Sequence, residues 1–347
     1  MRIASIATRI PSLKLSNEDV LSEIDKHNED LPRRVVERYK RELACLLRKS
    51  GAESRYLRNR SEGETAIGLL KAAMADALAQ AELDKSEIDL LMFCSVGRGF
   101  MEPANAYFCA QAMGMDCNCF DIGDACMSWV RSLEIAHHFL ETPRYKNIMV
   151  VNAEFTLYEY GHPDIFKIRF PNQIAYMFPA YTIGEAAVAT ILTKTDEKWT
   201  FDFESAPQAA SLCYLPLKGY EDFCENADAI GLNGVNGFVS FGSQLFEIAV
   251  HRMIRLVREK VPDIQEADIW FPHVAGSDPF RRAAEILNVD PEKFFTTGFP
   301  TYGNIISASI PAAMDLALKT HRLTRGQHVL LCPVSAGMCF AIVQFVF

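Results

Sequence analysis

In FDIGDACMSWVRSLEIAHHFL, residues 120–140, a short apolar strand-like run leads directly into a long helix-like run. Cys126 lies at the junction. A thiol in the first turn of a helix faces unpaired backbone N–H groups and the positive end of the helix dipole, which favours the thiolate. Free cysteines are also often buried for packing alone. Cys126 is therefore a candidate nucleophile, with a structural cysteine as the alternative.

Short apolar runs and longer amphipathic runs alternate along the rest of the chain. This alternation indicates helices packed on largely parallel sheets, which is an α/β fold. A looser region at residues 193–211 separates two such series. We therefore expect two similar halves, residues 1–195 with Cys126 and residues 196–347. The strand-like runs are residues 88–96, 147–155, 186–193 and 328–335 and the C-terminal CFAIVQFVF.

The composition is that of an ordinary globular protein, with 49% hydrophobic and 23% charged residues. No apolar run reaches the length of about eighteen residues that indicates a membrane span, and the start MRIASIATRIPSLKLS lacks the apolar core of a signal peptide. We therefore expect a cytoplasmic protein without membrane insertion, whose ten cysteines are reduced. The C-x-C pair Cys117 and Cys119 is a poor zinc site, because no second pair of ligands lies nearby.

Charge is unevenly distributed. The net charge of −9 argues against nucleic-acid binding. Residues 33–60, however, carry ten Lys or Arg against three acids. This basic segment is either a solvated helical face or a docking surface for an anionic partner, such as a phosphate-bearing carrier.

A histidine and an asparagine occupy positions where a cleft could expose them. His273 follows the apolar run Ile269–Pro272, and the ends of strands in α/β sheets are where ligands bind. Asn304 follows Gly303 and is placed to cap the next helix, a role that needs no catalysis. The adjacent pair His137 and His138 is assigned to packing or hydrogen bonding.

Three stretches in this order resemble the Cys, His and Asn motifs of the β-ketoacyl-ACP synthase III group of thiolase-like condensing enzymes. They are FDIGDACMSWVRSLEIA, FPHVAGSD and YGNIISASIPAAMDLAL. YTIGEAAVATIL resembles the glycine-acid-alanine turn of that family, and VLLCPVSAGMCFAIVQFVF resembles its glycine-rich loop and last strand. The resemblance implies a thiolase-like fold, in which two βαβαβ halves form an α-β-α-β-α arrangement.

The same resemblance implies a chemistry. Cys126 would take an acyl group from CoA or acyl carrier protein and then form a Claisen carbon–carbon bond with a second acyl or malonyl unit. His273 and Asn304 would donate hydrogen bonds to the enolate oxygen, and the backbone N–H groups at Cys126 and Ala336 to the acyl oxyanion. Such an acyltransferase (EC 2.3.1.-) acts in fatty acid, polyketide or other secondary-metabolite synthesis, as a homodimer without a tightly bound cofactor or metal.

Departures from the family concern substrate binding. Met127 and Trp129 replace smaller residues and a phenylalanine, so we expect these bulky side chains to shape the pocket, with the aromatic-rich segment 158–182 as its cover. The tryptophan that stacks on CoA adenine is missing near Ala44, while Arg48 remains. A carrier-protein donor therefore fits better, and Arg281 and Arg282 would extend its docking surface.

The segment SVGRGFMEPANAYF, residues 95–108, resembles the "EP" segment of head-to-head condensing enzymes from olefin and pyrone pathways. In those relatives a glutamate from the partner subunit acts as a base. Glu102 matches that position, with a solvated loop acid as the alternative, and Glu154 at a strand end is a further candidate base. Two other functions stay open: acyl transfer from the same acyl-cysteine to an alcohol or amine, and a catalytically degenerate partner subunit.

Overall fold

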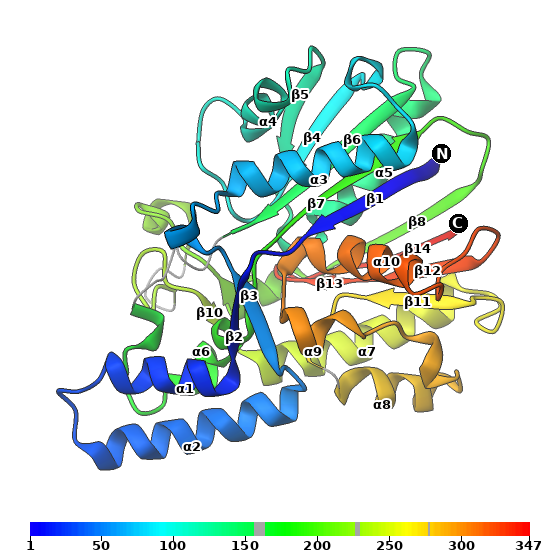
Figure 1. The fold of residues 1–347 in the computed structure, drawn as a ribbon. Coiled ribbons are helices and arrows are strands. Elements are labelled where there is room, and N and C mark those ends of the chain that lie inside the picture. Colours follow the sequence, from blue (N-terminus) through cyan, green and yellow to red (C-terminus); the bar gives the residue numbers. More distant parts are fainter. Residues whose placement is uncertain (156–163, 226–229, 277) are drawn as a thin grey trace.

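The computed structural model describes residues 1–155, 164–225, 230–276 and 278–347. Residues 158–163 of the predicted pocket cover lie outside the described residues. Two five-stranded sheets form the body of the molecule (Figure 1). The first has the order β1-β7-β6-β4-β5, in which β4 pairs parallel with β5 and β6, and β7 pairs antiparallel with β1 and β6. Its strands are β1 (Arg2–Arg9), β4 (Leu90–Cys94), β5 (Asn118–Ile122), β6 (Asn147–Glu154) and β7 (Ala186–Thr193).

The second sheet has the order β11-β12-β14-β13, with β8 pairing antiparallel to β14. Each sheet takes its strands from one side of residue 195, and the division of the chain into two halves there stays a prediction. The strands of this sheet are β8 (Trp199–Ser205), β11 (Ile269–Pro272), β12 (His328–Cys332), β13 (Val334–Ser335) and β14 (Cys339–Val346). Two small sheets pair β2 (Leu13–Ser16) with β3 (Ser54–Leu57) and β9 (Cys213–Tyr214) with β10 (Val239–Ser240).

Helices cover these sheets and fill the space between them. The α-helices are α1 (Asn17–Lys26), α2 (Arg33–Ser50), α3 (Ala66–Ala81), α4 (Asn105–Met113), α5 (Ser128–Glu141), α6 (Ile174–Met177), α7 (Gly242–Lys260), α8 (Asp278–Leu287), α9 (Gly298–Tyr302) and α10 (Ser309–Lys319). The 3-10 helices are η1 (Arg60–Glu62), η2 (Lys85–Glu87), η3 (Ala125–Met127), η4 (Asp164–Phe166), η5 (Phe178–Thr182), η6 (Pro207–Leu212), η7 (Tyr220–Phe223), η9 (Pro291–Lys293) and η10 (Ile306–Ala308).

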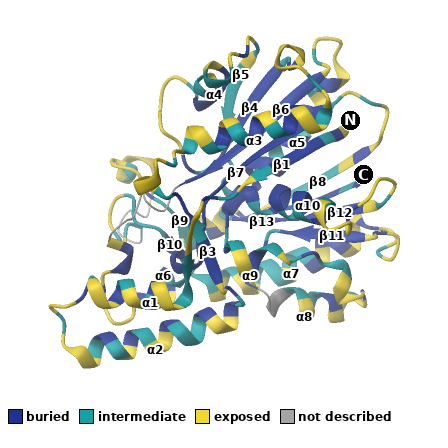
Figure 2. Cartoon of the chain, in the orientation of Figure 1, coloured by how far each residue is buried: buried dark blue, intermediate teal, exposed yellow. Residues whose placement is uncertain are grey.

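The layers follow from which apolar residues share a core. Leu133 of α5 and Met314 of α10 lie in one buried cluster with residues of both sheets, so these two helices form the central layer. Ala77 of α3 packs in a second cluster on the other face of the first sheet, and Val257 of α7 packs on the outer face of the second sheet with Trp270. The order is therefore helix, sheet, helix, sheet, helix, and the predicted α/β fold with α-β-α-β-α layers is confirmed. Figure 2 shows the strands of both sheets as the buried interior.

The paired helices α1 and α2 form an arm beside this body (Figure 1). Leu43 and Leu47 are completely buried in a cluster that also contains Tyr181 of η5. The Tyr39 hydroxyl lies 3.0 Å from that of Tyr181. The arm thus holds α6 and η5, which form part of the wall of the cavity described below.

Candidate active site

The nucleophile candidate Cys126 lies in η3, between β5 and α5. The preceding residue, Ala125, has a φ of 46°, a left-handed conformation that costs a non-glycine residue about 1–3 kcal/mol. The turn is held by hydrogen bonds on both sides. The Asp124 N–H donates to Ser128 Oγ at 2.8 Å, and the Met127 N–H donates to Ser335 Oγ of β13 at 3.2 Å. The turn that carries Cys126 is therefore fixed to the second sheet as well as to α5.

The surroundings of Cys126 work against the expected thiolate. Burial raises the pKa of the Cys126 thiol far above its ordinary value of 9, and the neighbouring groups Cys213, Glu154 and Asp124 raise it further. The direction of this shift favours the protonated thiol.

His273 directly follows β11, at the strand end where the sequence predicts a cleft. Burial lowers the pKa of its imidazole to about 4, so the ring is neutral at pH 7. Nδ1 is buried and has no hydrogen-bond partner among the described residues. A neutral imidazole carries one N–H, so His273 can donate one hydrogen bond without bringing a positive charge into the site.

The backbone of Asn304 is clamped by a close crossing of two loops. Its N–H donates to Thr182 O at 2.8 Å, and its carbonyl accepts from the Gly184 N–H at 3.0 Å. The crossing needs a glycine in each of the two loops. A Cβ on Gly184 would lie 2.2 Å from Tyr302 O, and one on Gly303, whose φ is 70°, would lie 2.3 Å from Thr182 O. The two glycines thus set the position of Asn304.

The side chain of Asn304 is oriented as well. Its Oδ1 accepts from the Ile306 N–H at 2.9 Å, although the N-cap residue of η10 is Ile305 and not the expected Asn304. Ile306 has a φ of 52°, an outlying conformation for a β-branched residue. With Oδ1 occupied, the NH₂ group of Asn304 is directed away from the Ile306 N–H, and no hydrogen bond engages it within the described part of the chain. It can therefore donate to a ligand.

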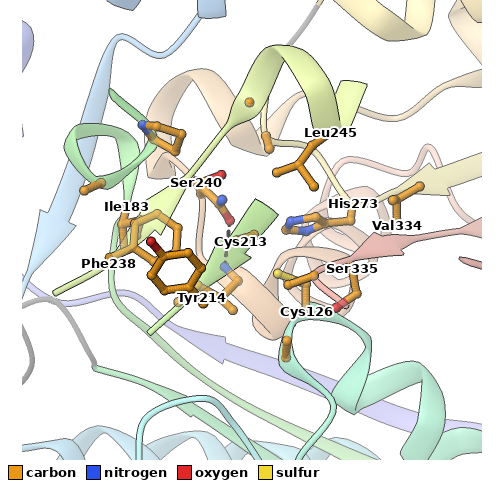
Figure 3. Close-up of a pocket in the computed structure, with 18 of the residues that line it drawn as sticks. Cys126, Ile183, Cys213, Tyr214, Phe238, Ser240, Leu245, His273, Val334 and Ser335 are labelled. Atoms are coloured by element: carbon orange, nitrogen blue, oxygen red, sulfur yellow. Dashed lines mark hydrogen bonds between the residues drawn. The ribbon is translucent and has the colours of Figure 1, made fainter. Parts of the chain in front are cut away.

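One cavity brings the three candidates together. Its volume is about 840 Å³, and Cys126, His273, Asn304 and Ala336 all line it. Figure 3 shows Cys126, His273 and Ser335 gathered around one space, with Cys213 of β9 facing it. This size lies within the range of about 300–1,000 Å³ typical of ligand pockets. The three elements that carry these residues come from both halves of the chain.

Met127 and Trp129 do not line the cavity, so the expectation that they shape it is wrong. Both are completely buried in the central core. The Trp129 Nε1–H donates to Thr190 Oγ1 of β7 at 3.0 Å. At η3 the chain turns into α5, and the side chains on either side of Ser128 point between the sheets while Cys126 faces the cavity.

The basic residues fall into separate groups. Arg281 and Arg282 line an exposed groove with Lys49 of α2, and this groove adjoins the cavity at Phe246. Arg48 is exposed on α2 but lines neither the groove nor the cavity.

Two arginines of the predicted basic segment are excluded from a docking surface. Arg55 is 1% exposed, and its guanidinium donates to Asn17 Oδ1 at 3.0 Å. Arg58 is 8% exposed and forms a buried ion pair with Glu185, with Nη2 and Oε1 3.1 Å apart. The fold holds both of these guanidinium groups inside, so the outward basic surface of this segment comes from the arginines and lysines of α2 and from Arg60 of η1.

The two candidate bases differ in environment. Glu102 is exposed on the loop before α4 and does not line the cavity of its own chain. Glu154 is completely buried, accepts a short hydrogen bond from Ser307 Oγ and accepts one from the Val96 N–H at 3.4 Å. Burial raises the pKa of Glu154 to about 7.

Several wall residues carry no local sequence signal. Ser335 bonds the Cys126 turn from 208 residues away, and Cys213 faces the cavity from a strand of two residues. Leu245 and Ala249 of α7 also line it, although their spacing is that of ordinary helix packing.

Within the described ranges, no helix has the length and apolar composition to cross a membrane, and no group of three or more His, Cys, Asp or Glu side chains could hold a metal ion.

Comparison with known proteins adds the following matches. Residues 120–161 match the family model of 3-oxoacyl-[acyl-carrier-protein] synthase III, and residues 258–346 match the model of its C-terminal part. The β-ketoacyl-[acyl-carrier-protein] synthase III of Campylobacter jejuni subsp. doylei is 27% identical, over 99% of this chain and 97% of the relative. The synthase III of Aquifex aeolicus is 26% identical, over 81% of this chain and 84% of the relative.

Solved structures share the fold over the whole chain. The crystal structure of the synthase III from Aquifex aeolicus VF5 has a TM-score of 0.78 at 22% identity and covers 100% of this chain and 99% of that protein. An OleA variant from Xanthomonas campestris, solved with lauric acid and lauroyl-CoA, has a TM-score of 0.80 at 20% identity and covers 99% of this chain and 98% of that protein.

Proposed function

We propose that this chain is a thiolase-fold condensing enzyme of the β-ketoacyl-ACP synthase III type, which joins acyl thioesters by Claisen condensation, and that Cys126 is its nucleophile. The observation that carries the assignment is that Cys126, His273 and Asn304 line one cavity. Nucleophile and hydrogen-bond donors must meet around one reacting carbonyl, and no other cysteine of the cavity wall lies on a turn between strand and helix.

The first step transfers an acyl group to Cys126. Its sulfur attacks the carbonyl carbon of a thioester, the bond between that carbon and the donor sulfur breaks, and the thiol proton leaves with the departing thiolate. The backbone N–H groups at Cys126 and Ala336 would hold the carbonyl oxygen while it bears negative charge. Because the resting thiol is protonated, this step includes the loss of the proton from sulfur.

The second step forms the carbon–carbon bond. The enolate of the second thioester attacks the acyl carbon, the bond between that carbon and the Cys126 sulfur breaks, and the departing thiolate takes up a proton from water or from the base that removed the α-proton. His273 and the NH₂ group of Asn304 would donate hydrogen bonds to the enolate oxygen. Burial keeps His273 neutral, so it stabilises this oxygen without protonating the carbanion, and the amide of Asn304 cannot titrate. A malonyl donor would form the enolate by losing CO₂, and an acyl donor by losing a proton to a base.

The donor is a CoA or acyl-carrier-protein thioester, with the carrier protein favoured. The groove that contains Lys49, Arg281 and Arg282 adjoins the cavity, so an anionic carrier bound there could pass its pantetheine arm inward. We expect no tightly bound cofactor. All ten cysteines are free, which fits the predicted cytoplasmic location.

A homodimer would give Glu102 a route to the reaction. The loop around it exposes Met101, 94% accessible, and Phe100, 46% accessible, and Tyr107 on α4 is 53% accessible. Apolar side chains gathered in this way are typical of a protein interface. From such an interface, Glu102 of one subunit would act as base in the cavity of the other. Glu102→Gln should then stop condensation of two acyl donors while Cys126 is still acylated; unchanged turnover removes Glu102 from the mechanism.

Intact-mass measurement after incubation with acyl-pantetheine or acyl-carrier thioesters tests the nucleophile. We expect one acyl adduct, which peptide mapping places on Cys126, and condensed product after a malonyl or second acyl donor is added. Cys213→Ala is the matched control, because that thiol lines the same cavity, and it should still form the adduct. An adduct that persists in Cys126→Ala contradicts the assignment.

A further inference from the structure

A buried carboxyl group lies next to the segment that carries Asn304. Glu154 ends β6 and is completely buried, and it does not line the cavity. The segments that it contacts, after β4 and at η10, do line the cavity, at Val96 and Ile306. A group in this place acts through its neighbours and not on a substrate directly.

Glu154 holds Ser307 of η10 by both the backbone and the side chain. One carboxyl oxygen, Oε1, accepts a short hydrogen bond from the Ser307 hydroxyl and a second bond from the Ser307 N–H at 3.3 Å. The same oxygen accepts from the Val96 N–H at 3.4 Å. Donors from two segments therefore converge on one atom, which fixes η10 against the end of β6.

The Ser307 hydroxyl is oriented from its other side as well. Asn152 of β6 is completely buried, and its amide donates to Ser307 Oγ at 2.9 Å and to Cys94 O at 3.0 Å. Cys94 O lies farther from the hydroxyl, at 3.3 Å, than the carboxyl oxygen does. The hydroxyl therefore accepts from Asn152 and directs its single hydrogen to Glu154, so the hydrogen bonds form a chain that ends on Oε1.

The second oxygen of Glu154 is engaged differently. Oε2 is buried and has no hydrogen-bond partner among the residues that the structure describes. Because donors already surround Oε1, the proton of a neutral Glu154 belongs on Oε2, and Oε1 keeps its bonds in both protonation states. A glutamine, whose carbonyl oxygen can take the place of Oε1, should therefore preserve the contact with η10.

The turn needs such a contact because its first residue is strained. Ile306 has a φ of 52°, and conformations of this kind persist only where the surroundings fix them. The Ile306 N–H donates to Asn304 Oδ1, and this bond sets the direction of the NH₂ group. Ile306 lies between Asn304 and Ser307 and thus links the buried carboxyl group to the amide in the cavity wall.

We propose that Glu154 is a positioning residue for the condensation step, which acts through Ser307 to keep η10 in the conformation that directs the Asn304 amide into the cavity. This inference rests on the proposed function, because it concerns a donor to the enolate oxygen. The turn of Cys126 is held separately, by Ser128 and Ser335. Loss of Glu154 should therefore slow carbon–carbon bond formation and spare acylation.

The experiment measures acylation of Cys126 and the following condensation separately, by rapid quench. Glu154→Leu leaves the donors of Ser307 and Val96 without an acceptor, so it should lower the condensation rate about tenfold or more and change acylation less than about twofold. Glu154→Gln keeps an acceptor oxygen and should restore condensation to within about threefold of the wild-type rate. If Glu154→Gln is as slow in condensation as Glu154→Leu, the proposal is wrong.

A double-mutant cycle distinguishes positioning from a general loss of stability. If Glu154 acts through Asn304, Glu154→Leu should change the residual condensation rate of Asn304→Ala by less than about twofold. An equal loss in the wild-type and Asn304→Ala backgrounds contradicts the proposal, because independent effects add.

Asp315→Leu is the matched control. It removes another buried carboxylate, which accepts from the Thr8 N–H at 3.0 Å and does not line the cavity. It should leave the ratio of condensation to acylation as in the wild type. A ratio that falls equally in Asp315→Leu and Glu154→Leu contradicts a specific role for Glu154.

Ser307→Ala keeps the proposal testable if Glu154→Leu does not fold. This variant removes the hydroxyl between Asn152 and Glu154 but keeps the bond from the Ser307 N–H. It should lower the condensation rate about threefold and have almost no further effect in Asn304→Ala. Condensation at the wild-type rate in Ser307→Ala contradicts the proposal.

Hydrogen exchange at the Ser307 amide separates this inference from the proposed function, because it needs no substrate. Glu154→Leu should speed this exchange at least about tenfold, and Glu154→Gln should not. Unchanged exchange in Glu154→Leu contradicts the proposal. If the wild type forms neither an acyl adduct nor a condensed product, the proposed function fails, and the exchange rates still decide whether Glu154 holds η10.

Discussion

The catalytic wall of the cavity and its wall on α7 belong to one space, yet they are built in different ways. Cys126, His273 and Asn304 follow short elements of secondary structure, and hydrogen bonds fix the turns that carry Cys126 and Asn304. The α7 wall, which includes Leu245 and Ala249, is a helix face that the second sheet does not fully cover. The turns fix the positions of the candidate catalytic residues, while the packing of α7 sets the space that is left for a substrate.

The largest effect should come from a residue that sequence reasoning placed in the pocket and the structure places in the core. Trp129→Ala removes a completely buried side chain and its hydrogen bond to Thr190, so it should lower the free energy of unfolding by about 3–5 kcal/mol. Urea denaturation measures this. Phe223→Ala, at a side chain that is 91% exposed, is the control and should change it by less than about 0.5 kcal/mol. If the Trp129→Ala variant is as stable as the wild type but accepts acyl chains of a different length, Trp129 would be a pocket residue and not a core residue.

The next effect separates the two donors from the nucleophile. His273→Ala and Asn304→Ala should each lower the rate of condensation about 10²–10³-fold, because each removes a donor to the enolate oxygen. Acylation of Cys126 should persist, since it uses the backbone N–H groups. Rapid-quench measurement of both steps checks this, with His328→Ala, an exposed histidine, as control. Equal loss of acylation and condensation would place these residues in the first step.

A buried carboxyl behind the catalytic wall should make stability depend on pH. The folded protein raises the pKa of Glu154 from its ordinary 4.5 to about 7, so the folded state binds more protons than the unfolded state between these values. Stability therefore falls as pH rises through this window, by about 3 kcal/mol in total. Glu154→Gln cannot ionise, and its stability relative to wild type should rise by that amount between about pH 5 and pH 8. Parallel stability curves would contradict the assignment.

The smallest effect should come from the outer groove. Arg281→Glu combined with Arg282→Glu should raise KM for an acyl carrier protein by about three- to tenfold at low salt, and the difference should shrink at about 0.5 M salt. Lys198→Glu, at an exposed lysine outside the groove, should have no such effect. If the KM difference does not depend on salt, these arginines are solvent-exposed residues without a role in carrier binding.

Local sequence predicted the alternation of strands and helices and the turns that carry the three candidate residues, because both depend on neighbours along the chain. The five-layer arrangement was implied by the family resemblance. Short apolar runs marked the strands, and the turn residues after them marked Cys126, His273 and Asn304. Met127 and Trp129 were misassigned because adjacency in sequence is not adjacency in space: the chain turns at η3 and sends them into the central core. Sequence also could not predict the thiol's raised pKa, which comes from burial by segments distant along the chain.

The basic segment, residues 33–60, also shows that contacts between distant parts of the chain are not visible in local sequence. Arg55 and Arg58 were counted with the exposed basic residues, but the fold buries both and pairs Arg58 with Glu185. Nothing within residues 33–60 indicates that partner, since it lies 127 residues further along the chain. The α7 wall of the cavity is the extreme case, because an apolar stripe with a spacing of four predicts packing equally well whether or not the opposite wall touches it.

The most direct test of the account is a crystal structure of the dodecanoyl-enzyme, trapped by single-turnover acylation. We expect electron density that is continuous with the Cys126 sulfur and a carbonyl oxygen at the backbone N–H groups of Cys126 and Ala336. A carbonyl oxygen turned away from these N–H groups, or an acyl group on a residue other than Cys126, would contradict it.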